Sequence, residues 1–179
     1  PFIVFEDSDL DSLVEGLVDA IWFNQGQVCC AGSRLLVQES VADEVIGKLK
    51  ERMETLIVGD PLDKNTDIGA INSAAQLEKI EQYLAIGKAE GAEMYQNSCA
   101  LPGTGYWCRP TLFSGVAQSN RVVQEEIFGP VLAIQTFRSL EEAARAHAYL
   151  SGWVLQLLAA SRGEDVATTL AHVRETLAR

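Results

Sequence analysis

Two short segments of this sequence combine residue types that can do chemistry. The first, residues 23–32 (FNQGQVCCAG), holds two adjacent cysteines between two glycines. A catalytic cysteine needs a lowered thiol pKa, partial exposure and nearby backbone N–H groups that hold a developing oxyanion. A turn loosened by Gly26 and Gly32 would give Cys29 that exposure. The residues alone leave a second interpretation open, because free cysteines are usually small buried apolar side chains.

The second segment, residues 124–131 (QEEIFGPV), places two acidic residues before an apolar-Gly-Pro turn. One of the two carboxylates, set in a cleft, would accept hydrogen bonds from the hydroxyl groups of a ligand. The alternative is a solvated acidic turn that leads into a strand. On the residues alone, that simpler alternative is the more common one.

The rest of the chain supplies helices and strands that must position these segments. Apolar side chains at helical spacing predict helices over 10–22, from 40 to 56, through 77–84 to Gly91, from 139 toward 150, and over 164–179. Short apolar runs predict strands over 34–38, 92–95, 107–113 and 131–137. Asp9 is placed as an N-cap, and Ser40 with Asp43 and Ser139 with Glu142 resemble capping boxes.

This alternation of helices and short apolar strands predicts an α/β fold with a largely parallel sheet flanked by helices. The composition is that of a globular protein, with 47% hydrophobic and 22% charged residues. The sequence contains no repeat, no low-complexity tract and no linker rich in Gly, Pro or Ser. At 179 residues we therefore expect one domain.

The balance of charge argues against several classes of partner. The chain has 14 basic and 25 acidic side chains and a net charge of −11. Nucleic-acid-binding proteins carry clustered Lys and Arg, so we expect no nucleic-acid partner. The same charge would repel an anionic membrane face, and the longest apolar stretch, near residues 153–160, is too short to span a bilayer. We therefore expect no membrane association.

The cysteines indicate neither disulfides nor a metal centre. The four are Cys29, Cys30, Cys99 and Cys108. Adjacent cysteines are poorly placed for an ordinary disulfide, and no CxxC pair occurs. His147 and His172 lie far along the chain from Cys29, and we expect them to be surface or packing residues. The sequence thus predicts no metal site, reduced thiols and a cytoplasmic protein.

Taken together, the two segments resemble the signatures of NAD(P)-dependent aldehyde dehydrogenases. Residues 23–29 (FNQGQVC) resemble the family's nucleophile signature, and residues 125–131 (EEIFGPV) resemble its second signature. Other family motifs follow in the family's order at residues 58–61, 69, 91–92 and 109–113. The resemblance runs from residue 1 to about 147. Residues 9–54 are more similar to the family 16 branch than to the common mitochondrial or cytosolic enzymes.

The resemblance implies roles for particular residues. Cys29 would be the nucleophile that forms a thiohemiacetal with a small-molecule aldehyde, which is then oxidised to a thioester and hydrolysed to a carboxylic acid. Glu126 would bind the nicotinamide-side ribose of NAD or NADP, and Phe128 would pack near the nicotinamide ring. Asn24 would shape the loop around Cys29, and Cys30 would have no chemical role.

The resemblance also implies a partial version of the family's three-layer catalytic domain. We expect residues 1–147 to be family-like, 148–163 to be divergent and 164–179 to form a family-like helix. Pro1 is not an initiator methionine, so we expect a fragment or a processed product. The family's general-base Glu, oxyanion-hole Asn, dinucleotide-binding domain and part of its oligomerisation region would lie outside these residues.

Two functional hypotheses follow from that expectation. In the first, the complete protein is a homo-oligomeric aldehyde dehydrogenase, and the isolated chain has little activity. In the second, the chain is a non-catalytic truncated isoform or pseudoenzyme that acts as an interaction module, because a domain cut from its partner exposes apolar surface.

Overall fold

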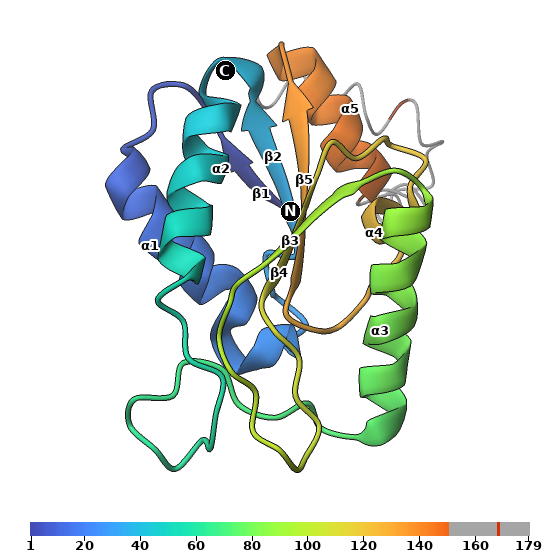
Figure 1. Ribbon diagram of the computed structural model, residues 1–179. Coiled ribbons are helices and arrows are strands. Elements are labelled where there is room, and N and C mark those ends of the chain that lie inside the picture. Colours follow the sequence, from blue (N-terminus) through green and yellow to red (C-terminus); the bar gives the residue numbers. More distant parts are fainter. Residues whose placement is uncertain (151–167, 169–179) are drawn as a thin grey trace. The chain divides into compact units, whose positions relative to one another are not determined.

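The computed structural model describes residues 1–150 and Thr168. The chain divides into two compact units, residues 1–139 and 140–179. The first unit is a five-stranded sheet with helices on both faces (Figure 1). Across the sheet the strands are β1 (Phe2–Val4), β2 (Arg34–Gln38), β5 (Val131–Phe137), β4 (Thr111–Ser114) and β3 (Glu93–Gln96).

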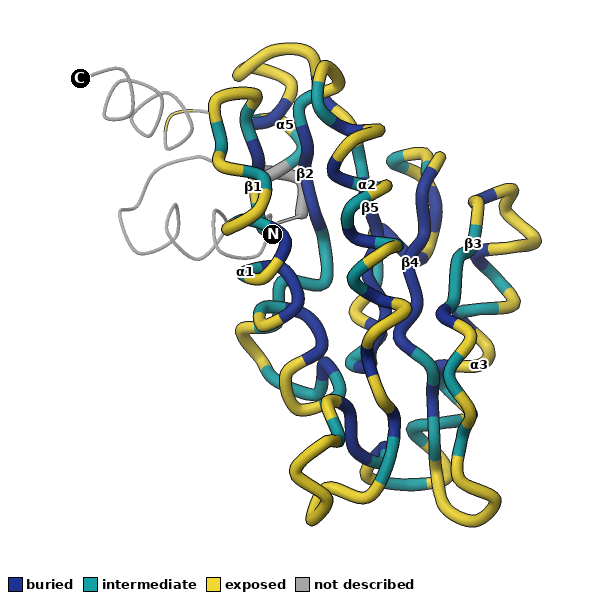
Figure 2. Tube along the Cα trace, turned by 60° about the vertical axis from the view of Figure 1, so that its left-hand side comes forward, coloured by how far each residue is buried: buried dark blue, intermediate teal, exposed yellow. Residues whose placement is uncertain are grey.

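The sheet is largely parallel, which confirms the predicted α/β fold. β1, β2, β5 and β4 run in the same direction, and only the edge strand β3 is antiparallel to its neighbour β4. Leu35 of β2 lies opposite Ile134 of β5, so both side chains point to the same face of the sheet. The buried residues run along these strands and the inner sides of the helices (Figure 2).

Helices α1 (Leu10–Trp22) and α2 (Glu39–Met53) cover one face of the sheet. The predicted N-cap of α1 is confirmed, because Asp9 Oδ1 accepts hydrogen bonds from the N–H groups of Asp11 (3.1 Å) and Ser12 (3.2 Å). The apolar stripe of α1 is buried as its spacing predicts. Its buried residues are Val14, Leu17, Val18, Ile21 and Trp22.

The predicted capping box at the start of α2 is wrong. The helix begins at Glu39, and its N-cap residue, Gln38, makes no capping hydrogen bond with its side chain. The Ser40 hydroxyl instead donates to Glu6 Oε2 at 2.9 Å. The serine thus links the start of α2 to the loop after β1, a contact 34 residues away in sequence that local spacing does not reveal.

Helices α3 (Ala74–Ala89) and α4 (Arg121–Gln124) lie on the opposite face. The Ser73 side chain caps α3 by accepting from Gln76 N at 3.2 Å. Gly87 lets α3 approach the sheet, since a Cβ there would lie only 2.7 Å from the Phe113 ring. Gly91 adopts a φ of +87° directly after the helix, as predicted for a C-terminal glycine.

Two other predictions concern the chain after β5 and the length of β4. Helix α5 (Leu140–Leu150) belongs to the second unit and confirms the helix predicted from Ser139 toward Leu150. The predictions for 151–179 lie outside the described residues, apart from Thr168. β4 is shorter than the predicted 107–113, because residues 107–110 form a loop that Arg109 anchors by donating to Cys99 O at 2.9 Å.

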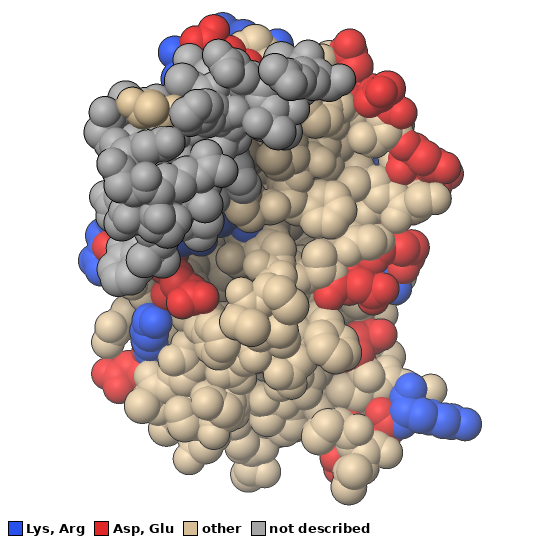
Figure 3. Space-filling view, turned by 180° about the vertical axis from the view of Figure 1, so that it is seen from behind, with Lys and Arg blue, Asp and Glu red and all other residues tan. Residues whose placement is uncertain are grey.

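The surface of the first unit carries its acidic side chains unevenly. Seen from behind, a row of acidic residues follows the right-hand edge, others lie at the left and the top, and the centre of that face is largely uncharged (Figure 3). Some acidic side chains of α1 pair with basic ones of α2, as in Asp11–Lys48 (2.7 Å) and Glu15–Arg52 (2.8 Å). Within residues 1–150, none of the helices is long and apolar enough to cross a bilayer.

The same substitution at a buried and an exposed leucine tests the core. Leu49 of α2 is fully buried and Leu62 is 92% exposed. We expect Leu49→Ala to lower the free energy of unfolding by about 2–5 kcal/mol, because it leaves a cavity. Leu62→Ala should change it by less than about 0.5 kcal/mol. Urea unfolding followed by circular dichroism measures both, and equal losses would contradict the packing described.

Candidate active site

A left-handed turn carries the chain from α1 to the cysteines. The segment η1 (Phe23–Gly26) follows α1, and three successive residues in it have positive φ: Asn24 (48°), Gln25 (58°) and Gly26 (68°). Such a run is costly for residues with side chains and persists only where the surroundings enforce it. The Asn24 amide closes the turn by donating to Gln27 O at 3.1 Å, a contact consistent with the loop-shaping role expected of it.

This turn lies directly against the second candidate segment. A Cβ on Gly26 would overlap the carbonyl oxygen of Gly129 and lie 2.7 Å from its carbonyl carbon. Beside it, the buried indole N–H of Trp22 donates to Pro130 O at 3.3 Å, across 108 residues of sequence. The structure therefore brings the two predicted signatures together at the amino ends of β2 and β5 (Figure 1).

The thiols of Cys29 and Cys30 are exposed in the turn that precedes β2. The interpretation of these two residues as buried apolar side chains is therefore wrong. Among the described residues, no acceptor binds the backbone N–H of Cys29, so that N–H is available to an oxyanion. Cys108 has the opposite environment, since its burial raises the pKa of its thiol to about 12.

Helix α3 holds the second segment through its backbone carbonyls. The Gln76 amide donates to both Ile127 O and Phe128 O at 2.9 Å, and Lys79 Nζ donates to Glu126 O at 3.1 Å. Three successive carbonyls are thus bound by two side chains of one helix. This arrangement holds Phe128 at its positive φ of 60°, with its ring partly exposed.

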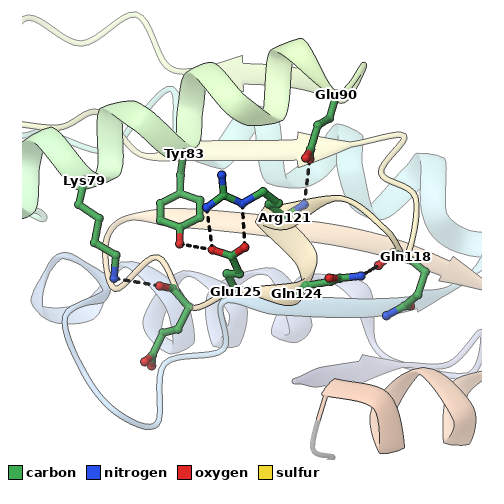
Figure 4. A network of polar contacts seen from close by, with 8 residues as sticks. Lys79, Tyr83, Glu90, Gln118, Arg121, Gln124 and Glu125 are labelled. Atoms are coloured by element: carbon green, nitrogen blue, oxygen red, sulfur yellow. Dashed lines mark hydrogen bonds and ion pairs between the residues drawn. The ribbon is translucent and has the colours of Figure 1, made fainter.

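The two adjacent carboxylates, Glu125 and Glu126, have different surroundings, and Figure 4 shows those of Glu125. Glu125 accepts two hydrogen bonds from Arg121 (2.7 and 3.0 Å) and one from the Tyr83 hydroxyl (2.5 Å). These donors, Arg121 foremost, lower the pKa of Glu125 to about 2. Glu126 is exposed, and no donor within the described part of the chain reaches its carboxylate. Only Glu126 is therefore free to accept from a ligand.

A half-buried arginine lies within electrostatic reach of Glu126. Arg34, at the start of β2, donates to Val123 O at 2.6 Å. Its burial lowers the pKa of the guanidinium, and the negative charge of Glu126 opposes that shift. In residues 1–150, no three His, Cys, Asp or Glu side chains are arranged to hold a metal ion.

Sequence reasoning missed the side chains that hold this site together. Gln25 and Gln27 bind the backbone of residues 69–72, and Gln76 binds the carbonyls of residues 127 and 128. These partners are 44 or more residues apart in sequence, so no local pattern reveals them. The Arg121–Glu125 pair did have a detectable signal, because oppositely charged residues four positions apart often pair at helical spacing.

Comparison with known proteins decides which family this arrangement belongs to. The model of the aldehyde dehydrogenase family matches residues 1–148. This chain belongs to that family. It is 42% identical over 145 residues to an aldehyde dehydrogenase from Davidiella tassiana, a match that covers 81% of this chain and 29% of that protein.

Solved aldehyde dehydrogenase structures have the same fold. The NAD-dependent enzyme from Sinorhizobium meliloti superposes with a TM-score of 0.79 at 39% identity, over 83% of this chain and 30% of that one. Betaine aldehyde dehydrogenase from Staphylococcus aureus, in complex with NAD⁺, has a TM-score of 0.77 at 35% identity, over 82% and 30%. The chain thus spans about 30% of the length of the relatives it matches.

Two glycine-to-alanine variants test the contact between the signatures. Gly26→Ala adds a methyl group against Gly129 and forces a side chain into a left-handed turn, so it should lower the free energy of unfolding by at least about 1–3 kcal/mol. The matched control is Gly16→Ala, inside α1, where a Cβ meets nothing within 4 Å. That variant should raise it by up to about 1 kcal/mol. Similar effects of the two variants in urea unfolding would contradict the contact.

The low pKa of Glu125 predicts a pH dependence of stability. A carboxyl whose folded pKa lies below its unfolded value stabilises the fold above the unfolded pKa, here 4.5, and this contribution disappears as the pH falls toward 2. Glu125→Gln removes it. At pH 7 the variant should be less stable than the parent, and the gap should narrow as the pH falls below about 4.5 and close near pH 2. A gap independent of pH in urea unfolding would refute the ion pair.

Proposed function

We propose that the protein to which these residues belong oxidises a small-molecule aldehyde to a carboxylic acid with NAD⁺ or NADP⁺, and that Cys29 is its nucleophile. The observation that carries the proposal is the turn that presents an exposed Cys29 while packing against Gly129, in the segment that also holds Glu126 and Phe128. A nucleophile and a candidate cofactor-binding segment thereby share one edge of the sheet. Family membership supports the reaction class.

The proposed chemistry begins at the sulfur of Cys29. Its thiolate attacks the carbonyl carbon, forming a C–S bond while the carbonyl π electrons move to oxygen. The backbone N–H of Cys29 then donates a hydrogen bond to that oxyanion. When the oxyanion re-forms the C=O bond, the carbon loses hydride and a thioester remains on Cys29. Water hydrolyses the thioester, which releases the carboxylic acid and restores the thiol.

The second segment suits the nicotinamide half of the cofactor, which supplies the hydride acceptor when it is bound. The exposed Glu126 carboxylate retains acceptors for the two hydroxyls of a ribose. The partly exposed Phe128 ring offers a flat apolar surface beside it. Because Gln76 and Lys79 bind the backbone of this segment, neither the Glu126 carboxylate nor the Phe128 ring is needed to hold it.

Several finer features stay predictions. They are the similarity to the family 16 branch, a cytoplasmic location, the homo-oligomeric state and the division of the chain at residues 147 and 163. For the 179-residue chain on its own we propose little dehydrogenase activity, because the general base expected from the family resemblance lies outside it, and loss of such a base commonly costs about 10²–10⁴-fold in rate.

Cysteine-resolved alkylation tests the proposal in the chain as it exists. With iodoacetamide at pH 7, we expect Cys29 to react fastest, because a nucleophilic cysteine is activated as well as exposed. Cys30 is the matched control, since it is also exposed but has no proposed role. Cys108 should not react, given its burial and its pKa of about 12. Peptide mass spectrometry measures each rate.

Two outcomes would each overturn one part of the proposal. If Cys29 reacted no faster than Cys30, exposure alone would explain its reactivity, and the hypothesis of a non-catalytic interaction module would be favoured. If the purified chain formed NADH rapidly from an aldehyde and NAD⁺, and Cys29→Ser abolished this activity, the low activity proposed for the chain would be wrong while the role of Cys29 would stand.

A further inference from the structure

Two glutamines on either side of Gly26 bind the same short segment, residues 69–72. The Gln25 amide donates to Ala70 O at 3.1 Å, and its Oε1 accepts from Gly69 N at 3.2 Å. Gln25 therefore uses its side chain both as a donor and as an acceptor, in the way that paired backbone strands use their peptide groups.

Gln27 makes the second of these two-way pairs, two residues before Cys29. Its Nε2 donates to Asn72 Oδ1 at 3.0 Å, and its Oε1 accepts from Asn72 N at 3.1 Å. Gln27 and Asn72 are 45 residues apart. The contact thus fixes the chain immediately before the nucleophile to a distant part of the fold.

The segment that Gln27 binds leads directly into α3. Ser73, the N-cap of α3, follows Asn72, and one turn later Gln76 binds the carbonyls of residues 127 and 128. Gly129 then returns to contact Gly26. The Cys29 turn and the segment that holds Glu126 and Phe128 are therefore connected twice, once by the contact between Gly26 and Gly129 and once through Asn72 and α3.

We infer that Gln27 is a positioning residue for the nucleophile, and that its paired hydrogen bonds with Asn72 hold the Cys29 thiol in its reactive setting. This inference rests on the proposed function. Gln27 is a better subject for a test than Gln25, whose φ of 58° would add backbone strain to any substitution. Gln27 has a φ of −90°, which other residues adopt readily.

The chemistry of the pair predicts which variants keep it. Gln27→Met has similar length but loses both hydrogen bonds. Gln27→Glu keeps the acceptor for Asn72 N, and rotation of the Asn72 side-chain amide would turn its NH₂ toward the new carboxylate. We therefore expect Glu to rescue what Met removes. Gln82→Met is the matched control, because within the described part of the chain the Gln82 amide donates only to Glu78 of its own helix, at 3.5 Å.

The readout is the ratio of the alkylation rates of Cys29 and Cys30 in one molecule. Gln27→Met should lower this ratio at least about threefold, the size expected for loss of a hydrogen bond at an exposed turn. Gln27→Glu should restore most of it, and Gln82→Met should leave it unchanged. Urea unfolding of each variant shows whether the fold is intact.

Each outcome decides the matter. A lower ratio in Gln27→Met with an unchanged urea midpoint, restored in Gln27→Glu, supports positioning. An unchanged ratio in a folded Gln27→Met overturns it. Faster alkylation of all four cysteines together with a lower midpoint also overturns it, because Gln27 would then only stabilise the fold. The proposed function fails separately, on the parent chain's own ratio of Cys29 to Cys30.

Discussion

The close approach of Gly26 to Gly129 is the constraint on which the site depends. Neither position has room for a side chain, because Gly26 faces the carbonyl of Gly129, while a Cβ on Gly129 would lie 2.5 Å from Ile80 of α3. The left-handed turn at residues 24–26 and the bond from Trp22 to Pro130 both follow from this contact. This packing of backbone against backbone brings the turn that carries the exposed Cys29 to the proposed cofactor segment.

The position of the site on the sheet explains why helix α3 contributes so much to it. In open α/β sheets ligands usually bind at the carboxyl ends of the strands, but here both segments precede their strands, β2 and β5. Their loops must therefore be held by neighbours. Side chains of α3 bind three successive carbonyls, and the residues before α3 pair with Gln25 and Gln27.

The pair Glu125–Glu126 shows how neighbouring residues of one type take different roles. The carboxylate of Glu125 is saturated by Arg121 and Tyr83, so it anchors the segment to α3 and α4 (Figure 4). The carboxylate of Glu126 has no such donor among the described residues, while its backbone carbonyl is bound by Lys79. One glutamate thus fixes the backbone that presents the other.

The sequence by itself determined the features that depend on neighbouring residues: the helix from Leu10 to Trp22 with its Asp9 cap, the strand from Arg34, the turn at Gly26 and the two signatures of the family. Helical periodicity, capping and glycine conformation are local properties, so local spacing reveals them. It did not reveal that Ser40 binds Glu6, that Tyr83 binds Glu125, or that Gln27 meets Asn72. Those contacts exist only once the sheet has brought distant segments together, and only the tertiary structure decides them.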